Sequence, residues 1–212
     1  MRILSRLAIV LLPLPFLLSG QSWEVGGSAG YGAFRDVTAT AVSSSGSTGF
    51  GPGVTFGGVF GNQINRWVGG EARYTFQEDD LRVSSGSTKA TMTGQSHAIH
   101  YDVLVHAASK ESKIRPFLAA GAGVKFYRGT GAEAAYQPLS NLVVLTHTKE
   151  AQPLISVGGG VKFAMSRRAI LRLDFRDYMT PLPSSLLAAP PFSRISGWMH
   201  DFVFLVGVST VF

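Results

Sequence analysis

The stretch "ILRLDFRDY", residues 170–178, alternates apolar and charged side chains along nearly its whole length. Its odd-numbered positions from Leu171 to Phe175 are apolar, and its even-numbered positions from Arg172 to Arg176 are charged. Side chains two residues apart lie on the same face of a β-strand. The alternation therefore predicts a strand with one apolar face and one charged face.

The same period of two recurs in seven other segments, and nothing after Ser22 shows the spacing of an amphipathic helix. Five of the seven are also rich in glycine, as in "IRPFLAAGAGVKFY". The seven segments are residues 23–34, 51–61, 67–77, 97–107, 114–127, 152–164 and 201–212. Together with the opening stretch they make eight predicted strands.

The connections between these strands alternate between short and long. The long ones are rich in Ser, Thr, Gly and Pro, which is the composition of surface loops. The short ones are residues 62–66, 109–113 and 166–168, and the long ones are 35–50, 78–92, 129–151 and 179–200. Tight hairpins at one end and long loops at the other are typical of an outer-membrane barrel. We therefore predict an all-β fold for residues 23–212: one eight-stranded antiparallel up-and-down transmembrane β-barrel.

The first segment, residues 1–22, has the features of a secretory signal peptide. Two arginines precede the apolar run 7–18, and small residues follow it. A membrane-spanning helix needs about 20 apolar residues, and Pro13 and Pro15 interrupt this shorter run. We therefore expect the segment to be cleaved and the mature chain to be exported.

Composition excludes several other classes of protein. The chain has no cysteine, which excludes disulfide scaffolds and thiolate metal sites. Charged residues make up 15% of the chain, against about 25% in ordinary soluble domains. The net charge is +6, but the basic residues are scattered singly, whereas a nucleic-acid surface needs a dense basic stripe. We predict no nucleic-acid partner.

Alternation alone does not decide whether the polar face points into a barrel or out to water. On several strands this face is largely Gly, Ala and Ser, which suit the crowded interior of a narrow eight-stranded barrel. Its charges are of both signs, so they can neutralise one another when buried. We predict a structural polar network in the lumen, made of Glu71, Arg73, His100, Asp102, Lys125, Lys162, Arg172, Asp174 and Arg176.

Aromatic residues gather toward the ends of the predicted strands. Amphipathic rings are typical of the two girdles at which a membrane barrel meets the lipid–water interface. The aromatics that we assign to these girdles are Trp23, Trp67, Tyr74, Tyr101, Tyr178 and Trp198.

Four pieces of the sequence resemble the small eight-stranded outer-membrane β-barrels of the outer membrane protein A and opacity type. They are "RPFLAAGAGVKFY" (115–127), "PLISVGGGVKF" (153–163), "LRLDFRDY" (171–178) and the terminal "GVSTVF". The resemblance covers nearly the whole mature chain. It implies the barrel fold and a location in the bacterial outer membrane.

In that family the last strand carries a signal that the barrel assembly machinery reads. The signal resembles a glycine followed, at set spacing, by an apolar residue and a terminal aromatic residue. Gly207 and Phe212 match it, whereas Thr210 stands where an apolar residue is preferred. The resemblance thus implies the assembly machinery as a partner during biogenesis.

His100, Asp102 and His106 share one strand face and invite a metal or catalytic interpretation. However, His106 would lie about 20 Å from His100 along an extended strand. A barrel enzyme acting on lipid A would need a nucleophile and a base. The sequence lacks the His-x-Ser-Asn string by which it would resemble the lipid A deacylases. We therefore predict no enzyme, no catalytic residue, no cofactor and no metal.

The function that these observations favour is that of an integral outer-membrane protein with a lumen filled by side chains. It would have a structural or surface-interaction role through four long extracellular loops. The partners expected are outer-membrane lipid, lipopolysaccharide and an extracellular molecule. Three alternatives remain: a narrow pore for ions or small solutes, a lipid A-modifying barrel enzyme, and a soluble periplasmic lipocalin-like binder.

Overall fold

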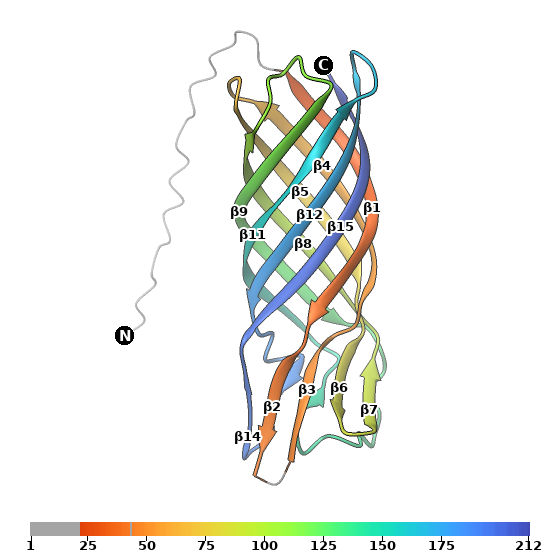
Figure 1. The fold of residues 1–212 in the computed structure, drawn as a ribbon. Helices are drawn as coiled ribbons and strands as arrows, with labels where there is room; N and C mark the ends of the chain where they lie inside the picture. The colour runs from red at the N-terminus through yellow and green to blue at the C-terminus, as the bar shows by residue number, and fades with distance from the viewer. Residues whose placement is uncertain (1–21, 43) are drawn as a thin grey trace, which may run out of the picture.

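The computed structural model describes residues 22–42 and 44–212, so the predicted signal segment 1–22 lies, apart from Ser22, outside the described residues. Eight long strands form a closed barrel (Figure 1). In order around the barrel they are β1 (Trp23–Arg35), β15 (Trp198–Val211), β12 (Ala169–Pro181), β11 (Lys149–Ala164), β9 (Ile114–Gly129), β8 (Gly94–His106), β5 (Val68–Glu78) and β4 (Gly53–Gln63). Each predicted segment corresponds to one of these strands, which confirms the eight-stranded antiparallel barrel.

The barrel closes because its first strand pairs with its last. β1 is antiparallel both to β4 and to β15. The backbones of Trp23 and Phe212 exchange two hydrogen bonds of 3.0 Å each. Strand edges left unpaired in a membrane would expose polar backbone groups to lipid. Pairing of the two terminal strands therefore satisfies the backbone around the whole barrel.

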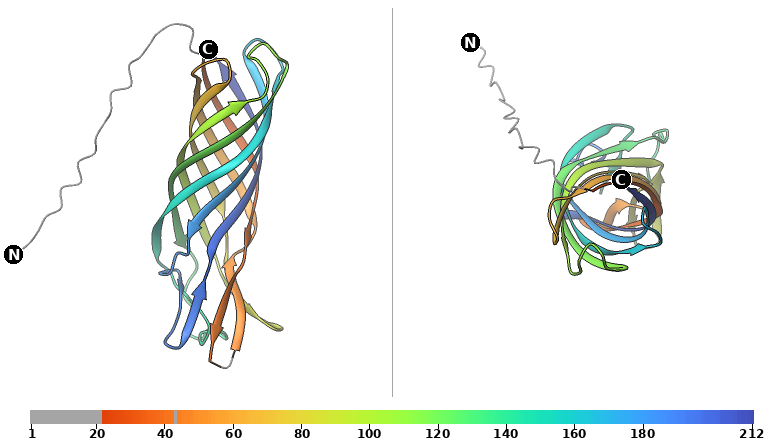
Figure 2. Two further views of the ribbon diagram at one scale, coloured as in Figure 1. Left: turned by 60° about the vertical axis from the view of Figure 1, so that its left-hand side comes forward. Right: turned by 90° about the horizontal axis from the view of Figure 1, so that it is seen from above.

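The two ends of the barrel differ. The C-terminus and the short turns lie at one end, called here the turn end, which is uppermost in Figure 1 and nearest the viewer in the right-hand view of Figure 2. The long connections lie at the opposite end, called here the loop end. This arrangement agrees with the predicted alternation of short and long connections.

The long connections contain more structure than the sequence predicted. Composition indicated plain surface loops, but they form a five-stranded sheet that projects beyond the loop end (Figure 1). The order in this sheet is β14 (Ser193–Ser196), β2 (Val37–Ala41), β3 (Ser44–Phe50), β6 (Leu81–Ser85) and β7 (Thr88–Met92), and a separate pair is formed by β10 (Val144–Leu145) and β13 (Leu187–Ala188). Threonine and valine favour strands, and β2–β3 and β6–β7 are hairpins within one connection. The pairs β14–β2, β3–β6 and β10–β13 join different connections, which the local sequence does not reveal.

Apolar side chains cover the outside of the barrel, as β15 shows. Phe204, Val206 and Val208 are 59%, 56% and 56% exposed, whereas Val203 and Ser209 are 0% and 2% exposed. The face of β15 that carries Ser209 therefore points into the lumen, and the face that carries Phe204 points outward. Soluble proteins rarely leave an apolar surface of this extent open to water. In the described part of the chain, no helix is long and apolar enough to cross a membrane.

The main apolar core lies at the loop end, beneath the projecting sheet. It joins residues from the ends of barrel strands to residues from all four long connections. Its fully buried members include Phe50, Leu81, Leu142, Leu186 and Met199. Burying an aliphatic or aromatic side chain stabilises a fold by about 1.5–3 kcal/mol. The core therefore fixes the long connections across the mouth of the barrel.

Candidate functional site: the charged lumen and the cavity at the turn end

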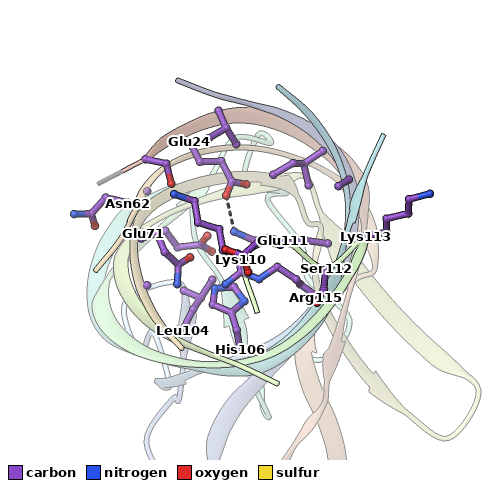
Figure 3. A pocket seen from close by; sticks show the side chains of 18 of the residues that line it. Glu24, Asn62, Glu71, Leu104, His106, Lys110, Glu111, Ser112, Lys113 and Arg115 are labelled. Carbon is purple, nitrogen blue, oxygen red and sulfur yellow. Dashed lines mark hydrogen bonds and ion pairs between the residues drawn. The ribbon is translucent and has the colours of Figure 1, made fainter. Parts of the chain in front are cut away.

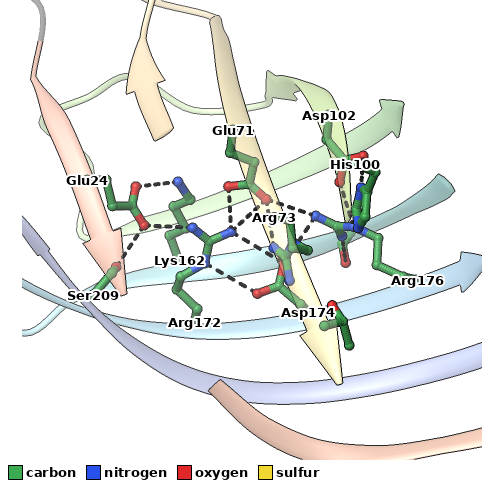
Figure 4. Close-up of polar contacts among 12 residues, drawn as sticks. Glu24, Glu71, Arg73, His100, Asp102, Lys162, Arg172, Asp174, Arg176 and Ser209 are labelled. Atoms are coloured by element: carbon green, nitrogen blue, oxygen red, sulfur yellow. Dashed lines mark hydrogen bonds and ion pairs between the residues drawn. The ribbon is translucent and has the colours of Figure 1, made fainter. Parts of the chain in front are cut away.

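Arg172 of β12 lies at the centre of a chain of ion pairs inside the barrel (Figure 4). Its Nη1 donates to Glu24 Oε1 at 2.7 Å, and its Nη2 donates to Glu71 Oε2 at 2.8 Å. Lys162 Nζ donates to the other oxygen of Glu24 at 2.6 Å. Alternation places these side chains on the inner faces of four different strands, so the pairs tie distant parts of the barrel together.

Glu71 is one of two carboxylates that each contact three guanidinium groups, and the other is Asp174. Its Oε1 accepts from Arg73 Nη2 at 2.6 Å and from Arg176 Nη2 at 3.3 Å, in addition to the contact with Arg172. Arg73 also donates to Asp174 at 3.0 Å. Glu71 and Asp174 together thus separate three guanidinium groups that would otherwise repel one another.

A second part of the network is a hydrogen-bonded chain that starts at Asp102. Arg176 Nε donates to Asp102 Oδ2 at 3.2 Å, and His100 Nδ1 lies 2.8 Å from Asp102 Oδ1. Because a carboxylate only accepts, Nδ1 carries the imidazole proton. The Nε2 atom then accepts from the Tyr178 hydroxyl at 3.1 Å, and that hydroxyl accepts from Thr75 Oγ1 at 3.2 Å.

Lys125 lies apart from this network, nearer the loop end. Its Nζ donates to Asp201 Oδ2 at 2.5 Å. It also lies 4.4 Å from the ring centroid of Phe34 and 5.2 Å from that of Tyr127. A cation against aromatic faces gains electrostatic energy when it is shielded from water. The pair links the polar lumen to the apolar core at the loop end.

The structure places all nine of the lumen residues that we predicted in the barrel interior, where each is buried. Eight of them share one network with Glu24, and Lys125 is in the separate pair with Asp201. The network contains four carboxylates and four Lys or Arg side chains, so its formal charges balance: Glu24, Glu71, Asp102 and Asp174 against Arg73, Lys162, Arg172 and Arg176. Balance of this kind is what allows charges to be buried.

The sequence analysis missed two carboxylates of the lumen, Glu24 and Asp201. Glu24 lies on the same strand face as Gly26 and Ser28, and Asp201 on the same face as Val203. Those neighbours lie on the lumen face of their strands, and alternation puts the two acids on the same face. The position of the two acids in the alternation of their strands was therefore the signal that could have identified them.

One aromatic assignment was wrong. Tyr178 was predicted to lie in a girdle, but it is 1% exposed and points into the lumen, where it bonds His100. Tyr178 follows Arg176 by two residues, so it lies on the same inner face of β12. The remaining predicted girdle residues lie on the outer surface: Trp67, Tyr74, Tyr101 and Trp198 are exposed, and Trp23 is half-buried against Phe60, with ring centroids 5.1 Å apart.

The structure does not bring His100, Asp102 and His106 together at one site. Among the described residues, no three His, Asp or Glu side chains are grouped so that they could hold a metal ion. His106 lies away from the pair formed by His100 and Asp102. The Ser96 hydroxyl donates to Asp79 Oδ2 at 2.6 Å.

A cavity of about 500 Å³ lies at the turn end of the lumen (Figure 3). Its inner wall is part of the ion-pair network, including Glu24 and Lys162. Its outer wall comes from the short turns, including Lys110 and Glu111, and His106 and Arg115 lie between the two. No motif in the sequence indicated this cavity, because its residues come from all eight barrel strands and all three short turns.

Asp79 lies at the loop end, between β5 and β6, and is almost completely buried. Burial disfavours the carboxylate and raises the pKa of Asp79 to about 8, against the opposing attraction of Lys125. Only Oδ2 has a partner, the Ser96 hydroxyl, and Oδ1 has none among the described residues. A neutral acid is the form that this environment favours.

The raised pKa of Asp79 predicts a pH-dependent stability. Between pH 3.8 and about 8 the folded chain holds a proton that the unfolded chain has released, so the free energy of unfolding falls as pH rises through this window. We expect Asp79→Asn to remove most of that decline and to be more stable than wild type at pH 8. Urea unfolding of the protein in lipid vesicles at pH 5 and pH 8 measures both effects.

Asp80→Asn is the control for this substitution, because Asp80 is the adjacent carboxyl and is exposed. It should leave the pH dependence as it is in wild type. Equal slopes in wild type and Asp79→Asn would contradict the assignment.

No protein-family model and no curated protein matches the chain. Among solved structures, neisserial surface protein A is similar with a TM-score of 0.54 at 13% identity, over 92% of this chain and 100% of that one. The N-terminal β-barrel domain of OprF from Pseudomonas aeruginosa is similar with a TM-score of 0.48 at 13% identity, over 90% and 97% of the two chains. With its closed antiparallel barrel and its apolar outer face, the chain has the fold of the small eight-stranded outer-membrane β-barrels and is a membrane barrel protein.

Proposed function

We propose that the protein is an outer-membrane surface protein that binds an extended peptide segment of a partner at the edge of its projecting sheet. The observation that carries this proposal is that the sheet β14-β2-β3-β6-β7 extends beyond the barrel with β7 and β14 at its two edges. The outer edge of a sheet presents backbone N–H and C=O groups that another strand can pair with. Strand addition of this kind is a recurring mode of peptide recognition.

The edge formed by β7 has a groove beside it that suits such a segment. A hollow of about 190 Å³ lies between β7 and residues 132–138, with Ala90, Met92 and Tyr136 in its walls. Tyr136 is 79% exposed, and exposed aromatic residues are frequent anchors in protein interfaces. Main-chain pairing with β7 would give affinity, and the apolar wall would select side chains on alternate positions of the peptide.

The filled lumen supports an interaction role rather than transport. The ion-pair network crosses the barrel interior, and the apolar core lies beneath the loops at its mouth. An eight-stranded barrel is just wide enough for side chains to fill it. We expect the wild-type protein to give no reproducible conductance steps in planar bilayers.

The outer surface supports a particular orientation in the asymmetric outer membrane. Arg128 of β9 and Lys149 of β11 are directly opposite each other, exposed, and next to the loop end. Arg35 is exposed at the same end of β1. Basic side chains at this level can pair with the phosphates of lipopolysaccharide, which supports an orientation with the loops outside the cell and the short turns in the periplasm. An exported precursor with residues 1–22 removed fits this orientation.

The last strand supports recognition by the barrel assembly machinery. Gly207 faces the lumen side of β15, and Phe212 is 67% exposed at the turn end. A terminal ring that points away from the barrel is accessible before β15 pairs with β1. Gly207 and Phe212 thus remain our candidates for the assembly signal.

Selection of a random decapeptide display library on the protein in lipid vesicles tests the proposed binding edge. We expect the enriched peptides to be rich in β-branched and aromatic residues, and to lose binding when the β6–β7 hairpin is shortened to a tight turn. Shortening the β2–β3 hairpin by the same length is the control, because it removes residues from the same sheet and leaves the β7 edge unchanged in sequence. Peptides that bind the variant lacking β7 as well as wild type would contradict the proposal.

The orientation is tested separately with an epitope tag inserted at Gly86, which is exposed at the tip of the β6–β7 hairpin and has a φ of 56°. An antibody should label the tag on intact cells. Labelling only after the outer membrane is permeabilised would contradict the orientation.

A further inference from the structure

The cavity at the turn end holds polar groups that the ion-pair network does not use. His106 Nδ1 and Arg115 Nη2 are buried atoms that line it and have no hydrogen-bond partner among the described residues. His106 is 3% exposed. In Figure 3 the two side chains extend into the cavity from neighbouring strands, β8 and β9. Leaving a buried polar group without a partner is unfavourable, so both atoms favour a further ligand.

Arg115 also lacks a charge partner where its neighbour has one. Arg115 and Lys162 are directly opposite each other on β9 and β11, and like charges in that position are destabilising. Lys162 is neutralised by Glu24 at 2.6 Å. The only hydrogen bond of the Arg115 side chain among the described residues is Nε to the backbone oxygen of Ala108, at 3.4 Å.

The lining as a whole carries excess positive charge. Five Lys or Arg side chains line the cavity, namely Lys110, Lys113, Arg115, Lys162 and Arg167, against three glutamates. Of the glutamates, Glu24 and Glu71 are both held by Arg172 in the balanced network. Only Glu111, on an exposed turn, remains to offset the other bases. The potential in the cavity therefore attracts anions.

We propose that this cavity is a binding site for a small organic anion that enters from the turn side. Arg115 donates from its guanidinium to a phosphate or carboxylate oxygen, and His106 donates to the same group from Nδ1. Leu104 and Ile170 line the cavity and contact the apolar part of the ligand. A guanidinium matches planar and tetrahedral oxyanions better than an ammonium does, because its donors form a rigid fork.

Calorimetric titration of the full-length mature protein in non-ionic detergent with inorganic phosphate and with citrate tests this site. We expect saturable binding of at least one of the two anions, and the stronger one identifies phosphate or carboxylate chemistry. Arg115→Gln should weaken that binding about tenfold or more, equivalent to about 1.4 kcal/mol. Arg168→Gln is the matched control, because Arg168 is an exposed turn arginine outside the cavity, and it should change the affinity less than twofold.

Failure of both anions to bind at concentrations up to about 10 mM would overturn the proposal. An equal loss in Arg115→Gln and Arg168→Gln would also overturn it, since that result requires only general attraction by the basic turns.

A measurement on the wild-type protein keeps the test independent of how the variants fold. In a sample with labelled histidine side chains, the anion should shift the imidazole resonances of His106 and leave those of His97 unchanged. His97 is on the same strand but faces outward near the loop end. No shift at His106 at saturating anion would overturn the proposal.

Discussion

Glu71→Ala should destabilise the barrel by about 3–5 kcal/mol, the cost of removing one partner from a buried ion pair. The substitution leaves Arg73, Arg172 and Arg176 with only one of the two carboxylates that contact all three, Asp174. The balanced network would then carry one uncompensated positive charge in a closed lumen. Urea unfolding of the folded protein in lipid vesicles, followed by tryptophan fluorescence, measures the loss.

Two further variants separate charge from packing. Glu71→Gln keeps the shape and part of the hydrogen bonding, so it should lie between Ala and wild type. Glu78→Ala removes an exposed glutamate from the outer face of the same strand, and surface changes of this kind stay within about 0.5 kcal/mol. A Glu71→Ala variant as stable as Glu78→Ala would show that the network is not what holds the lumen together.

Gly30→Ala should prevent normal closure of the barrel. A methyl group at Gly30 would overlap the backbone carbonyl of Phe204 and lie 2.9 Å from Leu205 Cα, on the neighbouring strand β15. Backbone atoms within a closed sheet cannot move aside as a flexible side chain can. We expect a cost of about 3 kcal/mol or more, the upper part of the range for overpacking, and a smaller folded fraction on unheated gels.

Gly27→Ala is the control on the same strand. Gly27 faces outward, and the nearest atom to an added methyl group would be the Gly57 carbonyl oxygen at 3.9 Å, an ordinary contact. This variant should fold like wild type. Equal folding of the two variants would contradict the close approach of β1 and β15 at Gly30.

The eight barrel strands could be predicted from the sequence because a membrane barrel repeats one rule along every strand. Alternation is local, so the inner position of Arg172 or Asp102 follows from its neighbours. The same rule, applied strictly, assigns Glu24 and Tyr178 to the lumen. Tyr178 was misassigned because aromatic identity was weighed above parity, and a tyrosine can be buried when its hydroxyl has partners such as His100 and Thr75.

The projecting sheet and the turn-end cavity could not be predicted in the same way. β2 pairs with its neighbour in the chain, β3, and also with β14, which lies more than 150 residues further along the chain. The cavity likewise depends on which inner side chains leave space when three separate turns come together. Such features arise from register between distant segments, and a single sequence carries no local pattern for them.

The central claim is that this chain forms a closed transmembrane barrel, and its electrophoretic mobility in membrane fractions tests that claim most directly. The mature protein should be found in the outer-membrane fraction and require detergent for extraction. On a denaturing gel, the unheated sample should migrate as a compact folded species, and boiling should shift it to the position of the unfolded chain. Recovery in the aqueous fraction without detergent, with the same mobility before and after boiling, would contradict the account.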